Sequence, residues 1–351
     1  MRFILLFLAF AAFSSVQAQK KSKKKMPKNL LTIAFYNQEN LFDTEDDPTI
    51  DDSEFLPTSA NQWDEAKYRK KLANMAYAIS TIGHNAPDIL GLCEVENRRV
   101  LEDLVKQESL AKYNYGIVHY NSPDERGIDV ALLYKKNVFT PFADKSIRIE
   151  LPNGDKTRDV LFVSGILGKK DTLHVFVVHF PSRRGGLEAS EPRRIIAATK
   201  VRQAVDSLLQ RNPKSNILLM GDWNDEPDNK SIIEVLKAKG DMQNLQAGDL
   251  FNPMARLKAE GLGSHAHYNS QEKKLEWNVL DQVILSQNLL DRKSKLQYLP
   301  NSATIYKPEF LLQQEPPQYK GQPLRTFAGK RYLAGYSDHF PVFVNLLPKG
   351  K

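Results

Sequence analysis

Five apolar runs in this chain end at residues that can bind a metal ion or move a proton. The first four runs have the Val, Ile, Leu and Phe content of a buried β-strand, and the ends of such strands are where loops present chemistry. The runs and their polar ends are Leu31–Tyr36 with Asn37, Ile89–Cys93 with Glu94, Leu173–Val178 with His179, Ile217–Met220 with Asp222 and Asn224, and Tyr336–Val342 with Asp338 and His339. Together they predict one convergent site that is hydrolytic, rich in oxygen ligands and dependent on a divalent metal.

The spacing of apolar residues predicts strands interleaved with helices. Helices are expected over 64–82 and 192–209, with a short third helix over 229–238. Strands are expected over 31–36, 89–93, 115–119, 130–134, 160–166, 173–179, 217–220, 279–286 and 342–346. Several neighbouring strands are too close in sequence for a helical crossover, so the sheet must be mixed or largely antiparallel. Long polar loops over 43–54, 252–263 and 304–322 are expected to shape a substrate groove.

The first 18 residues predict a secretory signal peptide. Arg2 is followed by the apolar run Phe3–Phe13 and by Val16-Gln17-Ala18, which has the small-x-small pattern of a cleavage site. The run is too short to span a bilayer as a helix, and we expect no transmembrane segment in the mature chain. We therefore expect a secreted or periplasmic monomer in which residues 19–29 form a basic linker and residues 30–348 form a single domain.

The net charge of +7 comes from the N-terminal tail. Seven of the 49 basic residues precede the first acidic residue, Glu39, which leaves 42 basic residues against 42 acidic ones. A neutral domain weakens the case for nucleic-acid binding, which depends on clusters of Lys and Arg, unless a local basic rim supplies them. The tail is either a solvated linker or a segment that binds a polyanion or an anionic membrane surface. The single cysteine, Cys93, excludes an intrachain disulfide and is expected to be a buried, inert side chain.

The sharpest motif is Gly221-Asp222-Trp223-Asn224, which follows an apolar run. The glycine permits a tight turn, and the Asp and Asn side chains then share one side of the chain, where they could grip an attacking water and a phosphate oxygen. The alternative is an Asx turn that closes the strand. Asp338 and His339 would point to opposite faces of an extended chain, so one of them would bind metal while the other contacts phosphate.

Three strand-end residues have both a functional and a structural interpretation. Glu94 ends so apolar a strand that its burial without a partner would be costly, and metal ligation would remove that cost. Asn37 could ligate Mg²⁺, hold a metal ligand in place, or be an ordinary turn residue. Asp281 could orient an imidazole and fix its tautomer, or be a strand-edge residue.

A Gly-rich loop begins at His179 and carries Arg183 and Arg184. An imidazole and two guanidinium groups suit phosphate oxygens, because Arg binds them in a bidentate manner. We therefore predict that both arginines bind the substrate.

Taken in order, these segments resemble the endonuclease/exonuclease/phosphatase superfamily, and residues 40–43 resemble its secreted bacterial branch. The resemblance spans about 31–347 and implies an α/β fold, a four-layer sandwich of two packed mixed β-sheets flanked by helices. It also implies a metal cofactor, Mg²⁺ or Mn²⁺. The residues that match the family's metal-binding positions are Asn37, Glu94 and Asp338. The residues that match its catalytic positions are His179, Asp222, Asn224, Asp281 and His339. Arg126 loosely matches a polar residue on the substrate side.

The resemblance implies in-line hydrolysis of a phosphodiester and leaves the substrate open. The first hypothesis is an endonuclease or exonuclease that acts on nucleic acid outside the cytoplasm. The second is a lipid or small-molecule phosphodiesterase or phosphatase, similar to a sphingomyelinase or an inositol-phosphate phosphatase. The third is a non-catalytic binding protein, although every matched position keeps its functional side chain.

Overall fold

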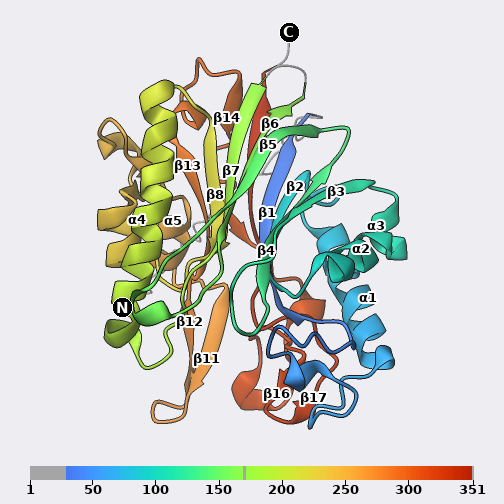
Figure 1. Cartoon of the computed structure of the whole chain (residues 1–351). Helices are drawn as coiled ribbons and strands as arrows, with labels where there is room; N and C mark the ends of the chain where they lie inside the picture. Colours follow the sequence, from blue (N-terminus) through green and yellow to red (C-terminus); the bar gives the residue numbers. More distant parts are fainter. Residues whose placement is uncertain (1–28, 169–170, 350–351) are drawn as a thin grey trace, which may run out of the picture.

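The computed structural model describes residues 29–168 and 171–349 (Figure 1). The predicted signal peptide and all of the predicted basic linker except residue 29 lie outside the described residues. No described helix is long and apolar enough to cross a membrane.

Two seven-stranded sheets pack face to face at the centre of the molecule (Figure 1). The first sheet has the order β14 (Leu296–Tyr298), β18 (Val342–Pro348), β1 (Leu31–Leu41), β2 (Ile89–Val95), β4 (Asp129–Lys135) and β3 (Tyr115–His119), and β15 (Thr304–Ile305) also pairs with β18. The second has the order β5 (Phe139–Ile147), β6 (Val160–Leu167), β7 (Asp171–His179), β8 (Ile217–Asp222), β13 (Asp281–Ser286), β10 (Leu250–Phe251) and β9 (Ala238–Lys239). The pairs β1–β2, β7–β8 and β9–β10 are parallel and the other pairs are antiparallel, so both sheets are mixed, as predicted.

Helices cover the outer faces of the two sheets and complete the predicted four layers (Figure 1). The helices beside the first sheet are α1 (Glu65–Thr81), α2 (Arg98–Lys106) and α3 (Glu108–Ala111), and those beside the second are α4 (Leu187–Arg211) and α5 (Met254–Ala259). Two hairpins project from the lower end in Figure 1, β11 (His265–Asn269) with β12 (Lys274–Asn278) and β16 (Phe327–Ala328) with β17 (Arg331–Tyr332). Single 3₁₀ turns span Ser53–Phe55, Pro152–Gly154, Met242–Asn244, Gln287–Leu289, Glu309–Leu311 and Pro317–Tyr319.

Strand β8 shows why the inner strands are continuous apolar runs. Leu218 and Met220 face the core between the sheets, whereas Ile217 and Leu219 pack beneath α4. Both faces of the strand are therefore buried, and no polar alternation is left in its sequence. The sheets approach closely, because a Cβ added at Gly91 of β2 would lie 3.0 Å from the sulfur of Met220. This packing brings together the carboxyl ends of strands from both sheets.

All nine predicted strands are present, with ends that differ by a few residues, and the helix predicted over 64–82 is α1. The helix predicted over 192–209 begins earlier, at Leu187, because Gly185 and Gly186 adopt positive φ values of 85° and 109° and break the chain just before it. The helix predicted over 229–238 is shorter than expected. A short π-helical turn at Ser231–Val235 leads instead into β9, because backbone pairing with β10 draws the chain into the sheet edge.

Other elements gave no clear sequence signal. Strand β5 is an edge strand with mostly exposed residues, and it contains Pro141, so it lacks an apolar run. Helix α2 buries only Val100, Leu101 and Leu104, and its N-cap Asn97 belongs to a stretch that reads as solvated. The segment 252–263, predicted as a loop, contains α5.

Candidate active site

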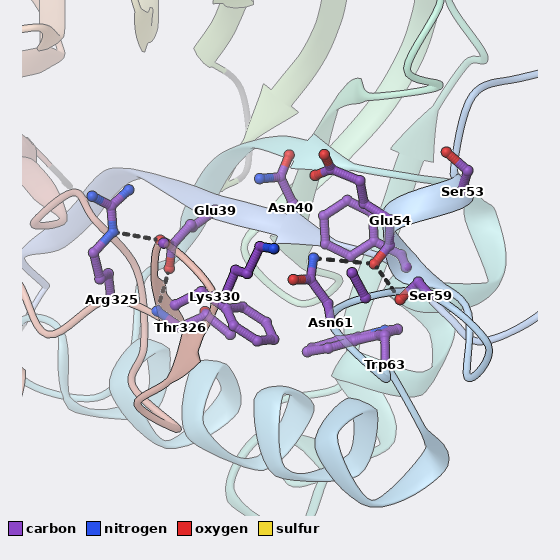
Figure 2. A pocket seen from close by; sticks show the side chains of 14 residues that line it. Glu39, Asn40, Ser53, Glu54, Ser59, Asn61, Trp63, Arg325, Thr326 and Lys330 are labelled. Atoms are coloured by element: carbon purple, nitrogen blue, oxygen red, sulfur yellow. Dashed lines mark hydrogen bonds and ion pairs between the residues drawn. The ribbon is translucent and has the colours of Figure 1, made fainter.

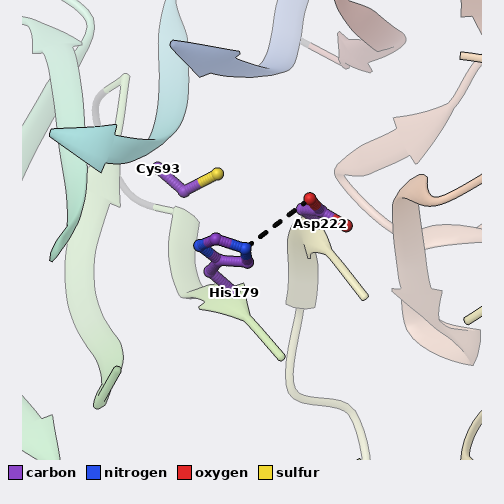
Figure 3. Close-up of side chains that lie close together, drawn as sticks. All are labelled: Cys93, His179 and Asp222. Carbon is purple, nitrogen blue, oxygen red and sulfur yellow. Dashed lines mark ion pairs between the residues drawn. The ribbon is translucent and has the colours of Figure 1, made fainter. Parts of the chain in front are cut away.

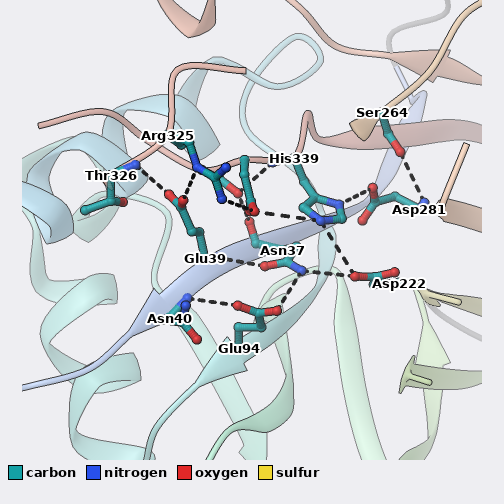
Figure 4. Close-up of polar contacts among 12 residues, drawn as sticks. Asn37, Glu39, Asn40, Glu94, Asp222, Ser264, Asp281, Arg325, Thr326 and His339 are labelled. Carbon is teal, nitrogen blue, oxygen red and sulfur yellow. Dashed lines mark hydrogen bonds and ion pairs between the residues drawn. The ribbon is translucent and has the colours of Figure 1, made fainter. Parts of the chain in front are cut away.

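The polar strand ends meet at one end of the two sheets (Figure 4). Asn37 of β1 links them, because its Nδ2 donates to Glu94 Oε1 at 3.3 Å and to Asp222 Oδ2 at 3.1 Å. The two imidazoles lie beside the same aspartate, with His179 Nε2 at 3.7 Å and His339 Nε2 at 3.8 Å from Asp222 Oδ2. Side chains from both sheets therefore converge on Asp222.

Asn37 is oriented as a donor towards the two carboxylates. Its Oδ1 accepts the backbone N–H of Glu39 at 2.8 Å, and this contact fixes which end of the amide is oxygen. The nitrogen therefore faces Glu94 and Asp222. This orientation suits the role of holding a metal ligand in place, and direct ligation through the oxygen stays a prediction.

Glu94, the last residue but one of β2, has a left-handed backbone with a φ of 56°. Its carboxylate accepts the backbone N–H of Asn40 at 3.1 Å as well as the Asn37 amide. Asn224, Glu39 and Asn40 also adopt positive φ values, of 48°, 45° and 57°. Non-glycine residues in this region are uncommon and are a feature of sites whose side chains must be aimed.

The Gly221-Asp222-Trp223-Asn224 turn is built as its sequence predicts. A Cβ at Gly221 would lie 2.2 Å from the carbonyl oxygen of Val178, so only glycine fits at this position. Asp222 Oδ1 accepts the Asn224 N–H at 2.9 Å, which is the Asx turn, while Oδ2 faces the site. The turn and the functional interpretation are therefore compatible. Burial raises the pKa of Asp222 to about 6.

His339 and Asp281 form a buried pair. His339 Nδ1 lies 2.7 Å from Asp281 Oδ2, and Asp281 starts β13 directly opposite Asp222 of β8. Burial lowers the pKa of His339, but the negative charges of Asp281 and Asp222 have the larger effect and hold this pKa well above its usual value. His339 Nε2 thus carries a proton and points towards Asp222. Ser337 fixes this segment, because its hydroxyl donates to Asn37 O at 2.8 Å and accepts the His339 N–H at 3.1 Å.

His179 differs from His339 in charge. Burial, together with the nearby Arg158, lowers the pKa of His179 well below its usual value, so its ring is neutral. Its Nδ1 is buried without a hydrogen-bond partner in the described residues. Cys93 faces His179 and Asp222 (Figure 3). The thiol is fully buried, and burial raises its pKa well above the usual value, so Cys93 is the inert buried residue that the sequence predicts.

A buried charge network behind the site was not predicted from the sequence. Glu39 is 8 % exposed and accepts from Arg325 Nε at 3.1 Å and from the Thr326 N–H at 2.6 Å. Figure 4 shows the contact of Arg325 with Glu39. Arg325 Nη2 also donates to Asp338 Oδ2 at 2.8 Å, so this guanidinium bridges two carboxylates. Lys71 of α1 is buried with its Nζ 3.9 Å from Glu39. Burial raises the pKa of Glu39 to about 7 and lowers that of Lys71 to about 8.

The three arginines predicted to bind substrate lie in different settings. Arg183 donates to Asn224 O at 2.8 Å, to Asn278 Oδ1 at 3.1 Å and to Asn229 Oδ1 at 3.1 Å, so its guanidinium braces the catalytic loop. Arg184 and Arg126 are exposed. Their role in substrate binding stays a prediction.

A buried ion pair supports the same loop. Arg194 of α4 and Asp225 are 0 % and 1 % exposed, with Arg194 Nε 2.7 Å from Asp225 Oδ1. Asp225 also accepts the Ser231 hydroxyl at 2.6 Å. Asp225→Ala would leave the Arg194 cation buried and unpaired, so we expect it to lower the free energy of unfolding by about 3–5 kcal/mol.

Urea denaturation of Asp225→Ala and of Asp228→Ala, an exposed control on the same loop, would measure the effect. A loss of under 1 kcal/mol for Asp225→Ala would contradict the importance of the pair.

Comparison with known proteins identifies the family. The model of the endonuclease/exonuclease/phosphatase family matches residues 32–348. The chain belongs to this family. Members are hydrolytic phosphoesterases, and the predicted superfamily is thereby confirmed. No curated protein sequence matches the chain significantly.

Solved structures of other family members share the fold. TDP2 from D. rerio complexed with a single-strand DNA product has 13% identity and a TM-score of 0.54, covering 91% of this chain and 99% of that one. A family protein from Bacteroides thetaiotaomicron has 16% identity and a TM-score of 0.53, covering 90% and 97%. The human Nocturnin catalytic domain with bound sulfate has 18% identity and a TM-score of 0.53, covering 91% and 95%. At these identities the similarity shows a shared fold.

The donor set at this family's site fits a hard divalent cation. No Lys or Arg nitrogen among the described residues forms an ion pair with the Glu94 carboxylate, and the ring nearest to it, His179, is neutral. A largely buried carboxylate without a cationic partner is costly, and a metal bound through oxygen would remove that cost. Asp338 offers a second carboxylate, and its Oδ1 lies 4.0 Å from His339 Nε2.

Proposed function

We propose that this family member is a divalent-metal-dependent phosphodiester hydrolase that cleaves nucleic acid outside the cytoplasm. The observation that carries the proposal is the placement of His339 Nε2 3.8 Å from Asp222 Oδ2, with Asn37 joining Asp222 to Glu94, a carboxylate that pairs with no Lys or Arg of the described residues. This arrangement places a general base, a hydrogen-bond donor for the phosphate and a metal ligand around one point.

Asp222 is the group that orients and deprotonates the attacking water. Its pKa of about 6 places it close to neutral pH, where a general base combines adequate basicity with a largely ionised state. Its Oδ2 is the oxygen that faces both histidines, while Oδ1 is occupied by the backbone of Asn224. Only one carboxylate oxygen is therefore directed at substrate.

His339 stabilises charge on the phosphate during attack. Asp281 accepts from Nδ1, which fixes the ring and leaves the Nε2 proton directed at the site. Neutral His179 lies on the other side of Asp222 and can hydrogen-bond a phosphate oxygen without repelling the metal.

Glu94 and Asp338 are the residues that would hold the metal, Mg²⁺ or Mn²⁺, with Asn37 positioning Glu94. When bound, the ion would polarise the phosphoryl oxygen and steady the leaving group. Arg325, whose side chain is 40% exposed and bridges Glu39 and Asp338, adds a fixed positive charge beside them.

Three observations favour nucleic acid over a lipid. The neighbouring fold of D. rerio TDP2 was solved with a single-strand DNA product, and the exposed Arg184 and Arg126 can supply part of the local basic rim that the neutral domain needs. The apolar segment 306–312, which a lipid-binding enzyme could insert into a membrane, packs against the domain: Leu311 is buried and the Phe310 ring lies 5.1 Å from that of Tyr77. Secretion is part of the proposal and rests on residues 1–18.

Hydrolysis by the purified protein in Mg²⁺ and in EDTA tests the proposal. The panel would contain plasmid DNA, single-stranded DNA, RNA, sphingomyelin and bis-p-nitrophenyl phosphate. We expect metal-dependent cleavage of nucleic acid, with EDTA abolishing it. Activity confined to sphingomyelin or the small diester would replace the nuclease by the lipid or small-molecule alternative, and no hydrolysis of any substrate would favour a binding protein.

A further inference from the structure

A pocket of about 630 Å³ lies next to the metal-binding side of the candidate site (Figure 2). Two segments far apart in sequence form it: the end of β1 with the loop that leads to α1, and the β16–β17 hairpin with the two residues before it. Its volume lies within the range of small-molecule sites. None of the residues assigned a catalytic or metal-binding role above lines it.

The pocket shares a wall with the metal side of the site. Asn40 lines the pocket, and its backbone N–H donates to Glu94 Oε2 at 3.1 Å. Arg325 lines it as well, and its guanidinium holds Asp338 at 2.8 Å. A group attached to a phosphate at the metal would therefore reach the pocket through a short linker.

An aromatic platform forms one side of the pocket. The Phe55 ring stacks on that of Phe42 with centroids 4.2 Å apart and 9° between the planes, and it meets Trp63 edge-on at 6.0 Å. Phe42 is buried and lies behind Phe55, outside the pocket lining, and Trp63 Nε1 donates to Phe42 O at 3.2 Å. Phe55 itself is only partly buried and lines the pocket. Its orientation is fixed before any ligand binds, which lowers the entropy cost of stacking.

The rest of the lining is polar and suits the edges of a planar ring. Asn40 and Asn61 offer amide donors and acceptors, and Ser53 and Ser59 offer hydroxyls. Lys330 on the hairpin turn brings a positive charge and Glu54 a negative one, whereas Arg325 and Glu39 pair with each other. A lipid tail would leave these polar groups unpaired, whereas a nucleobase presents a ring face and hydrogen-bonding edges.

We infer that this pocket binds the base of a nucleotide adjacent to the scissile phosphate, with Phe55 as the stacking residue. The inference rests on the proposed function and names the part of the substrate that the enzyme recognises. Because every base has a ring face, the pocket favours the presence of a base over any particular sequence.

Steady-state hydrolysis of a dinucleotide by wild type, Phe55→Leu and Phe142→Leu tests the inference, with two analogues that each lack one base. Phe142 is an exposed aromatic residue, 60% exposed, on the edge strand β5 of the other sheet, so Phe142→Leu is the matched control. We expect Phe55→Leu to lower kcat/KM for the dinucleotide about tenfold and to have no effect on the analogue that lacks the base held by the pocket. Phe55→Tyr, which keeps the ring, should restore wild-type values, and thermal unfolding would confirm that Phe55→Leu is folded.

The outcomes separate this inference from the proposed function. If wild type cleaves the dinucleotide and Phe55→Leu behaves as Phe142→Leu on every substrate, the pocket assignment is overturned and the nuclease proposal stands. If wild type hydrolyses bis-p-nitrophenyl phosphate in Mg²⁺ but no nucleic acid, the nuclease proposal fails and takes the pocket assignment with it.

Discussion

Asp222→Asn is expected to lower kcat for nucleic-acid cleavage on the order of 10³-fold, with little change in KM. The amide keeps the size of the carboxylate and can still accept the Asn224 N–H through its oxygen. It cannot take a proton from water, and it removes a negative charge that faces His339 at 3.8 Å. The chemical step is therefore lost while substrate contacts remain.

Single-turnover cleavage of an oligonucleotide in saturating Mg²⁺ would measure this loss. Asp249→Asn is the matched control, because Asp249 is also a buried carboxylate, paired with Lys239 at 2.6 Å on the far edge of the second sheet. Thermal unfolding of both variants would confirm that they are folded. If Asp222→Asn kept activity within tenfold of wild type, another group would have to activate water.

Glu94→Gln is expected to raise the Mg²⁺ concentration for half-maximal activity at least tenfold and to lower kcat on the order of 10³-fold. The charge of Glu94 has no cationic partner among the described residues, so its main interaction is assigned to the metal. Gln preserves the shape and can still accept the Asn40 N–H. The variant therefore removes the negative charge of Glu94 while the shape of the side chain is kept.

Mg²⁺ titrations of activity, and calorimetric Mg²⁺ binding without substrate, would test Glu94→Gln. The control is Glu102→Gln on α2, where the carboxylate is exposed and pairs with Arg98. An unchanged Mg²⁺ dependence in Glu94→Gln would show that Glu94 is not a metal ligand and would leave Asp338 as the candidate ligand.

The local pattern of the sequence was sufficient to predict the sandwich fold and the residues that end its strands. A strand buried on both faces must be an apolar run, as in Ile217–Met220, so a carboxylate directly after such a run needs a functional reason. Gly221 belongs to the same pattern, because the close approach of Val178 permits no side chain there. These signals lie within a few residues of one another along the chain.

Other parts of the site depend on contacts that no local pattern encodes. Glu39 meets Arg325 across 286 positions of sequence. Arg183 looks like a phosphate-binding residue in its Gly-rich loop, yet three asparagine oxygens occupy its guanidinium. Which end of the Asn37 amide faces Glu94 also follows from the fold, through the backbone of Glu39.

The sequence by itself determined the layered α/β fold, the set of strand-end residues and the phosphoesterase family. The burial of strands and the conformation of turns depend on residues that are close together in sequence, so they produce recognisable patterns of apolar and polar residues. Only the tertiary structure decided the charges of the two histidines, the bridging role of Arg325 and the pocket beside Phe55. These depend on burial and on the distance between side chains that different strands and loops bring together, for example the 2.7 Å contact between His339 and Asp281.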